Sequence, residues 1–568
     1  METWGVCGAV FDGQTFDNSS CQDIKNKIFK FWTDFRKELP DMKIETRGTN
    51  LSTAIDLASD AVPLRDIYNN ISNIKPPPNS PWAALNGDFG MELAGWMSHI
   101  AELPENSGYP FRFYTHDPWF INSPWLDRYG RNPHDIYMPL ALTRLDSKGK
   151  VEAPDQINFL SIDNSYGEMP DQVPDEVIPH IKAALRNSPD TAGPVIWLYP
   201  FDEYHEMTFT GDGVNEVFFG DWFMRTAINC GFQMNTVVSS NNFKAALESG
   251  ECKNKVIVTP TAIVRNHQTF ELITKFIQED GKVIFYGPVN DDKLLEILGL
   301  QKAEAISGRL QAHIDNASML IDHNPLYCAG GIDTVAETSK VIASVSNSNT
   351  ERAIAVLNDQ VAWVRGTNSF NIETQGRYPE MFDRGKYFYP EELMRIMLGK
   401  LGFVCEFKKV CKSTPDPVLV SNYNENALYI SAYVPDMNTA ELLKYPEGAP
   451  VFVETETYIQ NGLSVYHFPK AVHHECRVFV EMEDGVLKCQ EACLATPEVN
   501  RRLELSGLRN ATLRFRPAPG YEDKTEVLVD PAEAPFKTGE FLKAKKETNF
   551  AGTVLKYENV TGKVLISW

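Results

Sequence analysis

Strand-like runs that end abruptly in polar residues recur in the first third of the chain and limit the folds available to it. The clearest runs are Val6–Asp12, Met42–Arg47, Phe111–Asp117 and Ile157–Asp163. A segment of helix length follows each run, which is the pattern of repeated β/α units. In β/α barrels the functional side chains lie where the strands end. Four such units are half of the eight in a closed barrel, so we predict a partial β/α barrel over residues 1–188.

A helix is predicted over Asp23–Leu39, because apolar residues recur there at a helical period: Ile24, Ile28, Phe31, Phe35 and Leu39. This helix connects the strand that ends at Asp12 with the strand that contains Glu45. We therefore expect a β/α/β unit with a right-handed crossover, in which the two strands are parallel. Three more helices are expected in this region, at Glu92–Leu103, Ile136–Leu145 and Asp175–Asn187.

Apolar strands alternate with helices after the turn-rich stretch Ser188–Gly193. The strands are expected at Val195–Tyr199, Gln233–Val238, Lys255–Thr259 and Lys282–Tyr286. Apolar strands separated by helices indicate a parallel sheet that is covered on both faces. We therefore predict a flavodoxin-like parallel α/β domain over residues 189–410.

Short runs of alternating apolar and polar residues, separated by turns, fill the chain from residue 411 to 568. Examples are Pro417–Tyr423, Asn426–Val434 and Cys476–Glu483. A period of two with frequent turns is typical of an antiparallel β-sandwich. The predicted fold class is thus α/β plus β: a partial barrel, a flavodoxin-like domain and a C-terminal sandwich.

The charge of the chain excludes several classes of partner. Its net charge is −22, whereas nucleic-acid binding requires basic patches. The same charge disfavours an anionic membrane surface, and no apolar run approaches the ~20 residues of a membrane span. The N-terminus lacks a secretory signal, so we expect a cytoplasmic protein. Secretion stays open, because the first residues resemble the interior of a domain and the chain then begins partway through a longer protein.

No cofactor or metal is expected. The chain has no glycine-rich nucleotide-binding motif, and none of its 10 cysteines forms a Cys-x-x-Cys pair. The compact group His473, His474, Cys476, Cys489 and Cys493 lacks the paired spacing that is usual for zinc. Scattered reduced thiols are the simpler interpretation of these cysteines.

Carboxylates at the predicted strand ends suggest glycoside hydrolysis, which needs two carboxyl groups as acid and as nucleophile or base. Asp12, Glu45 and Asp117 are the candidates for these roles. Glu45 and Arg47 lie two residues apart on one strand, so their side chains share a face. Arg47 would hold a neighbouring carboxylate ionised or bind a sugar hydroxyl. A structural ion pair at the barrel rim is the alternative.

Aromatic and polar residues beside these carboxylates are candidates for sugar binding. They are Arg47, His116, Trp119, Asp163 and Tyr166. Sugar rings stack their C–H faces on tryptophan, while their hydroxyls bind Asp, His and Arg. A buried core tryptophan and a helix-capping turn at Ser161–Tyr166 are the structural alternatives.

A second acidic cluster, Tyr199–Glu206, follows the first strand of the middle domain. Open α/β sheets bind ligands at such strand ends. A subunit contact, or a rim of the first domain's cleft, would explain the same residues. The middle domain lacks a Gly-x-Ser-x-Gly elbow, and no Cys or Ser nucleophile follows the strand that ends at Tyr286.

The order of the three regions resembles the family 42 β-galactosidases and the related lacto-N-biose phosphorylases. Segments of the middle region resemble the amidotransferase-like domain of these enzymes: VIWLYPFDEY, WFMRTAINCGFQMNTVVSS, NKVIVTPTAIV and ITKFIQEDGKVIFYGP. The resemblance implies a catalytic barrel, a middle domain that lacks amidotransferase catalysis and often makes the oligomer contact, and a small β domain. If Phe111–Asp117 is the seventh barrel strand, the family nucleophile falls near His116 or Asp117, where the family has glutamate.

Two hypotheses of different classes follow. The first is a glycosidase that acts on an oligo- or polysaccharide and forms homo-oligomers, although a chain lacking early barrel strands would be inactive. The second is a non-catalytic carbohydrate-binding or oligomerisation protein with a degenerate barrel.

Overall fold

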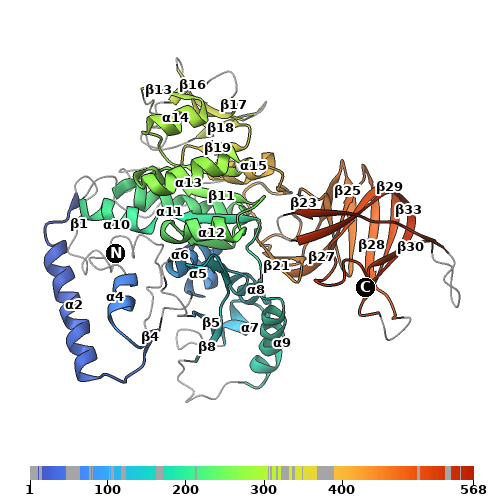
Figure 1. Ribbon diagram of the computed structural model, residues 1–568, viewed down its shortest axis with the longest axis horizontal. Coiled ribbons are helices and arrows are strands. Elements are labelled where there is room, and N and C mark those ends of the chain that lie inside the picture. The colour runs from blue at the N-terminus through green and yellow to red at the C-terminus, as the bar shows by residue number, and fades with distance from the viewer. Residues whose placement is uncertain are drawn as a thin grey trace.

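The structure is a computed structural model of the protein. It describes residues 10–11, 16–45, 64–75, 79, 81–101, 103, 108–116, 123–161, 170–210, 214–304, 306, 310–314, 317–321, 332–335, 339–347, 350–366, 389–494, 499–530, 539–549 and 552–568. It is a mixed α/β protein that ends in a large antiparallel β domain (Figure 1).

The first region consists of short strands and helices around three separate two-stranded sheets. Its elements are β1 (Val10–Phe11), β2 (Phe16–Asp17), α2 (Cys21–Glu38), β3 (Ile44–Glu45), α4 (Leu64–Asn70), β4 (Ile74–Lys75), α5 (Pro81–Leu85), α6 (Phe89–Ala101), β5 (Pro110–His116), α7 (Pro124–Asp127), α8 (His134–Leu140), β6 (Thr143–Leu145), β7 (Val151–Glu152), β8 (Gln156–Ser161) and α9 (Gln172–Arg186). Two pairs, β3–β4 and β5–β8, are parallel, as expected for β/α units. Barrel closure is not shown by the described residues.

Two sequence predictions for this region are corrected. Among the described residues β1 pairs with β2 and β3 pairs with β4 in separate sheets, so the β/α/β unit predicted around α2 is not found. The helix predicted over Ile136–Leu145 stops at Leu140, and Thr143–Leu145 forms β6. The reason is long-range pairing: Thr143 and Arg144 align with Thr236 and Val237 of a strand in the middle region.

An 11-stranded sheet forms the centre of the molecule, in the order β15-β14-β17-β18-β19-β12-β11-β9-β10-β6-β7. Its parallel part contains β6, β9 (Val195–Tyr199), β10 (Thr236–Ser239), β11 (Val256–Pro260), β12 (Lys282–Tyr286) and β19 (Val361–Val364). The four strands predicted here are confirmed within three residues at each end. The antiparallel extension beyond β19 was not predicted; it contains β14 (Leu310–Ile314), β15 (Ala317–Ile321), β17 (Lys340–Ser346) and β18 (Glu351–Asn358).

Helices cover both faces of the parallel strands. Along β9, Trp197 and Tyr199 face one core with residues of α6, α11 (Val214–Asn229) and α15 (Glu392–Lys400). Ile196 and Leu198 face a second core with α12 (Ser240–Ser249), α13 (His267–Gln278) and α14 (Asp292–Leu298). Every residue of β9 is buried, which explains why its sequence is apolar without alternation. The remaining elements here are α10 (Phe201–Thr210), the 3-10 helix η1 (Thr261–Arg265), and the paired strands β13 (Leu300–Lys302) and β16 (Ile332–Val335).

The C-terminal β domain is antiparallel throughout the strand pairs that the structure describes. Its strands are β20 (Val404–Lys408), β21 (Val418–Asn424), β22 (Ala427–Tyr433), β23 (Ala440–Lys444), β24 (Ala449–Phe452), β25 (Thr455–Gln460), β26 (Leu463–Tyr466), β27 (Ala471–Glu481), β28 (Gly485–Glu491), β29 (Arg502–Phe515), β30 (Glu526–Val529), β31 (Glu540–Phe541), β32 (Lys545–Asn549) and β33 (Gly552–Ser567). The two longest, β29 and β33, pair along their length, with register shifts at three points.

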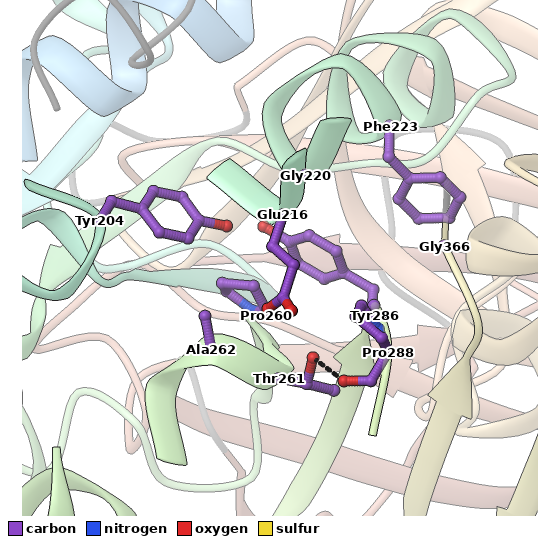
Figure 2. A pocket seen from close by; sticks show the side chains of 11 residues that line it. Tyr204, Glu216, Gly220, Phe223, Pro260, Thr261, Ala262, Tyr286, Pro288 and Gly366 are labelled. Carbon is purple, nitrogen blue, oxygen red and sulfur yellow. Dashed lines mark hydrogen bonds between the residues drawn. The ribbon is translucent and has the colours of Figure 1, made fainter. Parts of the chain in front are cut away.

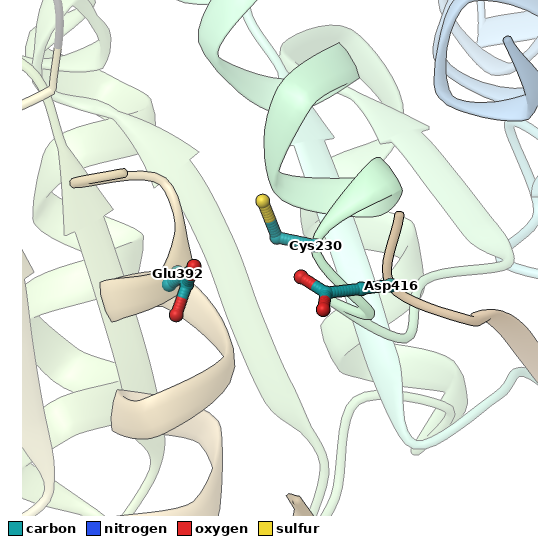
Figure 3. Close-up of side chains that lie close together, drawn as sticks. All are labelled: Cys230, Glu392 and Asp416. Atoms are coloured by element: carbon teal, nitrogen blue, oxygen red, sulfur yellow. The ribbon is translucent and has the colours of Figure 1, made fainter. Parts of the chain in front are cut away.

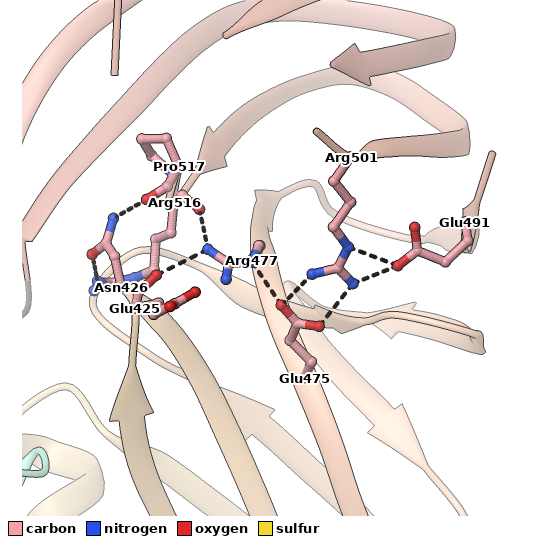
Figure 4. A network of polar contacts seen from close by, with 8 residues as sticks. All are labelled: Glu425, Asn426, Glu475, Arg477, Glu491, Arg501, Arg516 and Pro517. Carbon is pink, nitrogen blue, oxygen red and sulfur yellow. Dashed lines mark hydrogen bonds and ion pairs between the residues drawn. The ribbon is translucent and has the colours of Figure 1, made fainter. Parts of the chain in front are cut away.

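An ion-pair network ties neighbouring strands of this domain together (Figure 4). Arg501 binds both oxygens of Glu475, at 2.7 and 2.8 Å, and its Nε donates to Glu491 at 2.8 Å. Arg477 donates to Glu475 from its own strand at 2.6 Å. Burial works against ionisation of Glu475, but the two guanidinium groups hold its pKa below the ordinary value. The network is therefore structural.

In the part of the chain that is described, no helix is long and apolar enough to cross a membrane.

Candidate functional site

The strand pair β5–β8 brings two of the predicted strand ends together. The strands are parallel, with Phe111 opposite Ile157, Tyr114 opposite Leu160 and, after an irregularity, His116 opposite Ser161. Parallel neighbours end at the same edge of a sheet. The chain therefore leaves both strands side by side, and the next segments in sequence begin with Asp117 and with Ile162.

The predicted site residues mostly lie outside the described residues. This holds for Asp12, Arg47, Asp117, Trp119, Asp163 and Tyr166. Glu45 and His116 are described only as strand residues: Glu45 ends β3 opposite Lys75, and His116 ends β5 opposite Ser161. Their assignment to a site stays a prediction.

A buried polar cluster beneath β5 was not predicted from the sequence. Asn79 accepts a hydrogen bond from the backbone N–H of Arg112 at 2.6 Å, and its Nδ2 donates to the Arg112 carbonyl at 3.2 Å. The same Nδ2 donates to Glu92 Oε1 at 2.6 Å. Asp135 accepts from the hydroxyl of Tyr129. Glu92 lies in the first turn of the apolar helix α6, and Asp135 lies in the first turn of α8. The only sequence signal was therefore a charged residue within a buried pattern.

The two carboxyl groups of this cluster have unusual acidities. Glu92 is 1% exposed and Asp135 is 0% exposed. Burial raises the pKa of Glu92 well above its ordinary value, and Asp135 raises it further. Burial also raises the pKa of Asp135 to about 7, although hydrogen bonds from Glu92 and Tyr129 oppose the shift. Paired carboxyls with raised pKa values occur at functional sites and in structural networks alike.

A second candidate site is a cavity at the carboxyl ends of β11, β12 and β19 (Figure 2). Its empty volume is about 270 Å³, and its lining includes Tyr204, Glu216, Phe223, Tyr286 and Gly287. Gly287 has a φ of +110°, and a Cβ there would lie 2.9 Å from Thr261 Oγ1. The position is one at which open α/β sheets bind ligands. A side chain at position 287 would collide with the Thr261 hydroxyl, so the lining needs a glycine there.

The acidic cluster Tyr199–Glu206 has structural partners. Its middle is the first turn of α10, where Glu203 accepts hydrogen bonds from Asn266 Nδ2 at 2.7 Å and Ser240 Oγ at 3.0 Å. Asp202 accepts from Asn241 at 2.6 Å. These bonds connect α10 to the helices that follow β10 and β11. Only Tyr204 of this cluster lines the cavity.

One group of described residues has the composition of a metal site, namely Cys230, Glu392 and Asp416 (Figure 3). Their potential ligand atoms lie within 4.8 Å of one another. Asp416 is already paired with Lys409 at 2.7 Å, and Arg395 lies 3.8 Å from Glu392. Two cations compete for the carboxylates, so ion pairing accounts for this group.

The two histidines of the suspected C-terminal cluster have structural partners. His474 packs against Phe452 and Phe468 within the β domain, and His473 lies at the contact with the first region. His473 lies parallel to the ring of Tyr137, with centroids 4.1 Å apart, and its two nitrogens contact Asn187 at 2.9 Å and Ser431 at 3.0 Å. Cys476 donates to a backbone carbonyl. These contacts leave His473 no nitrogen for a metal.

Comparison with known proteins gives a structural likeness only. No protein-family model matches the chain, and no curated protein matches it in sequence. Two solved structures are similar to 80% of the chain: Gan42B, a GH42 β-galactosidase, with a TM-score of 0.38 and 10% identity, and the β-galactosidase from Rahnella sp. R3, with a TM-score of 0.39 and 11% identity. The match spans 66% of the length of each of these chains.

Proposed function

We propose that the chain belongs to a carbohydrate-active enzyme that cleaves glycosidic bonds with paired carboxylates. The observation that carries the proposal is the parallel pair β5–β8, with His116 opposite Ser161 at its carboxyl edge. The sequence places carboxylates, an imidazole and aromatic rings directly after these two strands. Sugar hydroxyls and ring faces are bound by this combination of side chains.

The proposed architecture is a partial β/α barrel over residues 1–188, a flavodoxin-like domain related to amidotransferases over 189–410, and a β-sandwich over 411–568. The first region also contributes β6 and β7 to the edge of the central sheet. This shared sheet would hold the barrel region against the middle domain. A homo-oligomer and an oligo- or polysaccharide substrate are part of the same proposal.

Within the proposed site, Asp12, Glu45 and Asp117 would supply the acid and the nucleophile or base. One of them must keep a raised pKa in order to donate a proton to the leaving oxygen. Arg47, His116, Trp119, Asp163 and Tyr166 would bind the sugar.

The alternative is a non-catalytic carbohydrate-binding or oligomerisation protein. A specific observation favours it: among the described residues, β3–β4 and β5–β8 are separate two-stranded sheets rather than parts of one barrel wall. A degenerate barrel could bind sugar at β5–β8 without bringing two carboxylates to one glycosidic bond.

Turnover of chromogenic aryl glycosides, with and without phosphate, tests the proposal. We expect turnover with one sugar and its loss in Asp117→Asn, Glu45→Gln or Asp12→Asn. Asp175→Asn, on the exposed face of α9, is the matched control and should leave the rate unchanged. Normal rates in all three site variants would refute the residue assignment. A folded protein that binds oligosaccharides in calorimetry but turns over none of the panel would support the alternative.

A further inference from the structure

The strand β5 has a neighbouring strand on one edge only, among the described residues. Its partner there is β8. At the other edge the carboxamide of Asn79 pairs with both the N–H and the carbonyl of Arg112. An amide side chain thus replaces the peptide group that a third strand would supply. Asn79 is buried, so loss of this pairing would leave backbone groups without partners.

Asn79 is held in turn by Glu92 of α6, which accepts from its Nδ2. The other oxygen of Glu92, Oε2, and the Oδ1 of Asp135 are buried and accept from no donor that the structure describes. The two carboxyl groups nevertheless lie close enough that each affects the pKa of the other. Two ionised carboxylates could not hydrogen-bond to each other, because both are acceptors only.

Among the described residues, no Lys or Arg side chain contributes to the pKa shift of either carboxyl group. The phenol of Tyr129 stays neutral, because burial raises its pKa well above the ordinary value. His134, next to Asp135, is also neutral at physiological pH, since burial, assisted by Lys470, lowers its pKa to about 3. Three ionisable groups on neighbouring elements have partners of their own: Arg225 with Asp88, Glu176 with Arg131, and His180 with Tyr137.

We propose that Glu92 and Asp135 share one proton in the folded protein and that this pair, through Asn79, positions β5 for the site at its carboxyl end. One proton between Glu92 Oε2 and Asp135 Oδ1 satisfies both oxygens and reduces the buried charge from two to one. The raised pKa values of both groups agree with this arrangement. The shared proton depends on the fold alone. The statement that β5 is positioned for a site rests on the proposed function.

The shared proton makes stability depend on pH in a defined direction. The pKa values are raised in the folded state, so the folded protein retains a proton that the unfolded chain releases above its ordinary carboxyl pKa of about 4. The pair therefore favours folding at low pH, and its contribution declines as the pH rises toward 7. One proton changes the folding equilibrium constant tenfold for each pH unit in this window.

Glu92→Gln removes the titration while retaining the hydrogen bonds. The glutamine Oε1 can accept from Asn79, and its Nε2 can donate to an ionised Asp135. Denaturant midpoints should be measured from pH 5 to pH 7 for the wild type, for this variant and for Glu248→Gln, an exposed control. We expect the folding equilibrium constant of the wild type to fall tenfold for each unit of rising pH, relative to that of E92Q. The Glu248→Gln variant should show the same pH dependence as the wild type. Parallel profiles of the wild type and E92Q would overturn the shared proton.

Infrared spectroscopy provides a readout that does not depend on unfolding. At pH 6.5 the difference spectrum of wild type minus E92Q should contain the band of a protonated carboxyl group. If E92Q does not fold, Asp135→Asn serves for the same comparison. Absence of the band in a folded pair of proteins would show that both carboxyls are ionised and would refute the proposal.

Hydrogen exchange tests the positioning of β5. Asn79→Ala should accelerate amide exchange in residues 110–116, whereas Asn70→Ala, an exposed amide that bonds only within its own helix, should not. Unchanged exchange in Asn79→Ala would refute the positioning role. Hydrogen exchange and the free energy of unfolding can both be measured without turnover. The proposal about Glu92, Asp135 and Asn79 can therefore be tested even if the protein is not a glycosidase. If turnover is found, E92Q should shift the pH profile of kcat/KM while Glu248→Gln does not.

Discussion

Two helices of the first region, α6 and α2, have opposite environments. All 13 residues of α6 are buried, including Glu92, Ser98 and His99. In α2, which has 18 residues, only Cys21 is buried, and Phe31 is 59% exposed. Figure 1 shows α6 among the central elements and α2 at the margin of the molecule. The sequence predicted a helix in both places, at Asp23–Leu39 and Glu92–Leu103, but it did not reveal how much of either is covered.

The helix α6 is buried in part by α11, which is distant from it in sequence. It packs against α11 so closely that a Cβ at Gly90 would lie 2.0 Å from the carbonyl oxygen of Arg225. The Gly90 N–H donates to Asn229 at 2.7 Å, and Arg225 pairs with Asp88. The aromatic residues Phe31, Trp32 and Phe35 of α2 contact each other, with ring centroids 5.5 to 6.1 Å apart. Burial in this molecule thus follows from tertiary partners rather than from helix periodicity.

The largest effect is expected in the core of α6. Leu93→Ala removes a fully buried side chain and should lower the free energy of unfolding by about 3 kcal/mol, because a cavity remains. Chemical denaturation at pH 7 measures the loss. A change below about 1 kcal/mol would mean that α6 is less tightly packed than the structure shows.

Two helix glycines give a sharper comparison of close packing. Gly90→Ala should cost about 2 kcal/mol, because the clash with α11 exceeds the gain in helix propensity. Gly399→Ala in α15 should instead add about 0.5 to 1 kcal/mol, since its Cβ would lie 3.8 Å from Val404 Cα. Denaturant unfolding midpoints of the two variants, compared with the wild type, test the predicted loss of stability in Gly90→Ala and the predicted gain in Gly399→Ala. Equal shifts in the two variants would contradict the close approach of α6 and α11.

The contact of the first region with the C-terminal domain should weaken in acid. Burial, with a minor contribution from His474, lowers the pKa of His473 to about 4. The unfolded chain binds the proton near pH 6.5, so this contribution to stability is complete above that pH and declines as the pH falls toward 4. Between pH 7 and pH 5.5 the loss should be roughly 1 kcal/mol. His473→Gln should remove this part of the pH dependence, and thermal unfolding at the two pH values measures it.

The sequence predicted those parts of the fold that depend on local pattern. Val195–Tyr199 was predicted with its observed bounds, because a strand buried on both faces is apolar at every position. Thr143–Leu145 was assigned to a helix, because its pairing with β10 lies more than 90 residues away. A similar reason hid the cluster of Asn79, Glu92 and Asp135, because Asn79 pairs with Arg112 on a strand that begins about 30 residues later.

The candidate site was predicted only to the level of strand ends. The sequence indicated that β5 and β8 end next to polar segments, and the structure adds that the two ends are adjacent. Periodicity cannot decide which carboxylates face one sugar, because this depends on loop conformations after the strands. The roles assigned to Asp117 and Asp163 therefore stay predictions that mutation must test.

The smallest effect is expected on the exposed side of α2. Phe31→Ala should change the free energy of unfolding by less than about 0.5 kcal/mol, because the ring already lies mostly in water. The matched change Phe89→Ala in α6, where the ring is fully buried, should cost about 3 kcal/mol or more. Denaturation of both variants should be repeated over a hundredfold range of protein concentration. A large loss in Phe31→Ala that disappears on dilution would show that association covers α2, and the contrast between the two helices would then hold only for the isolated chain.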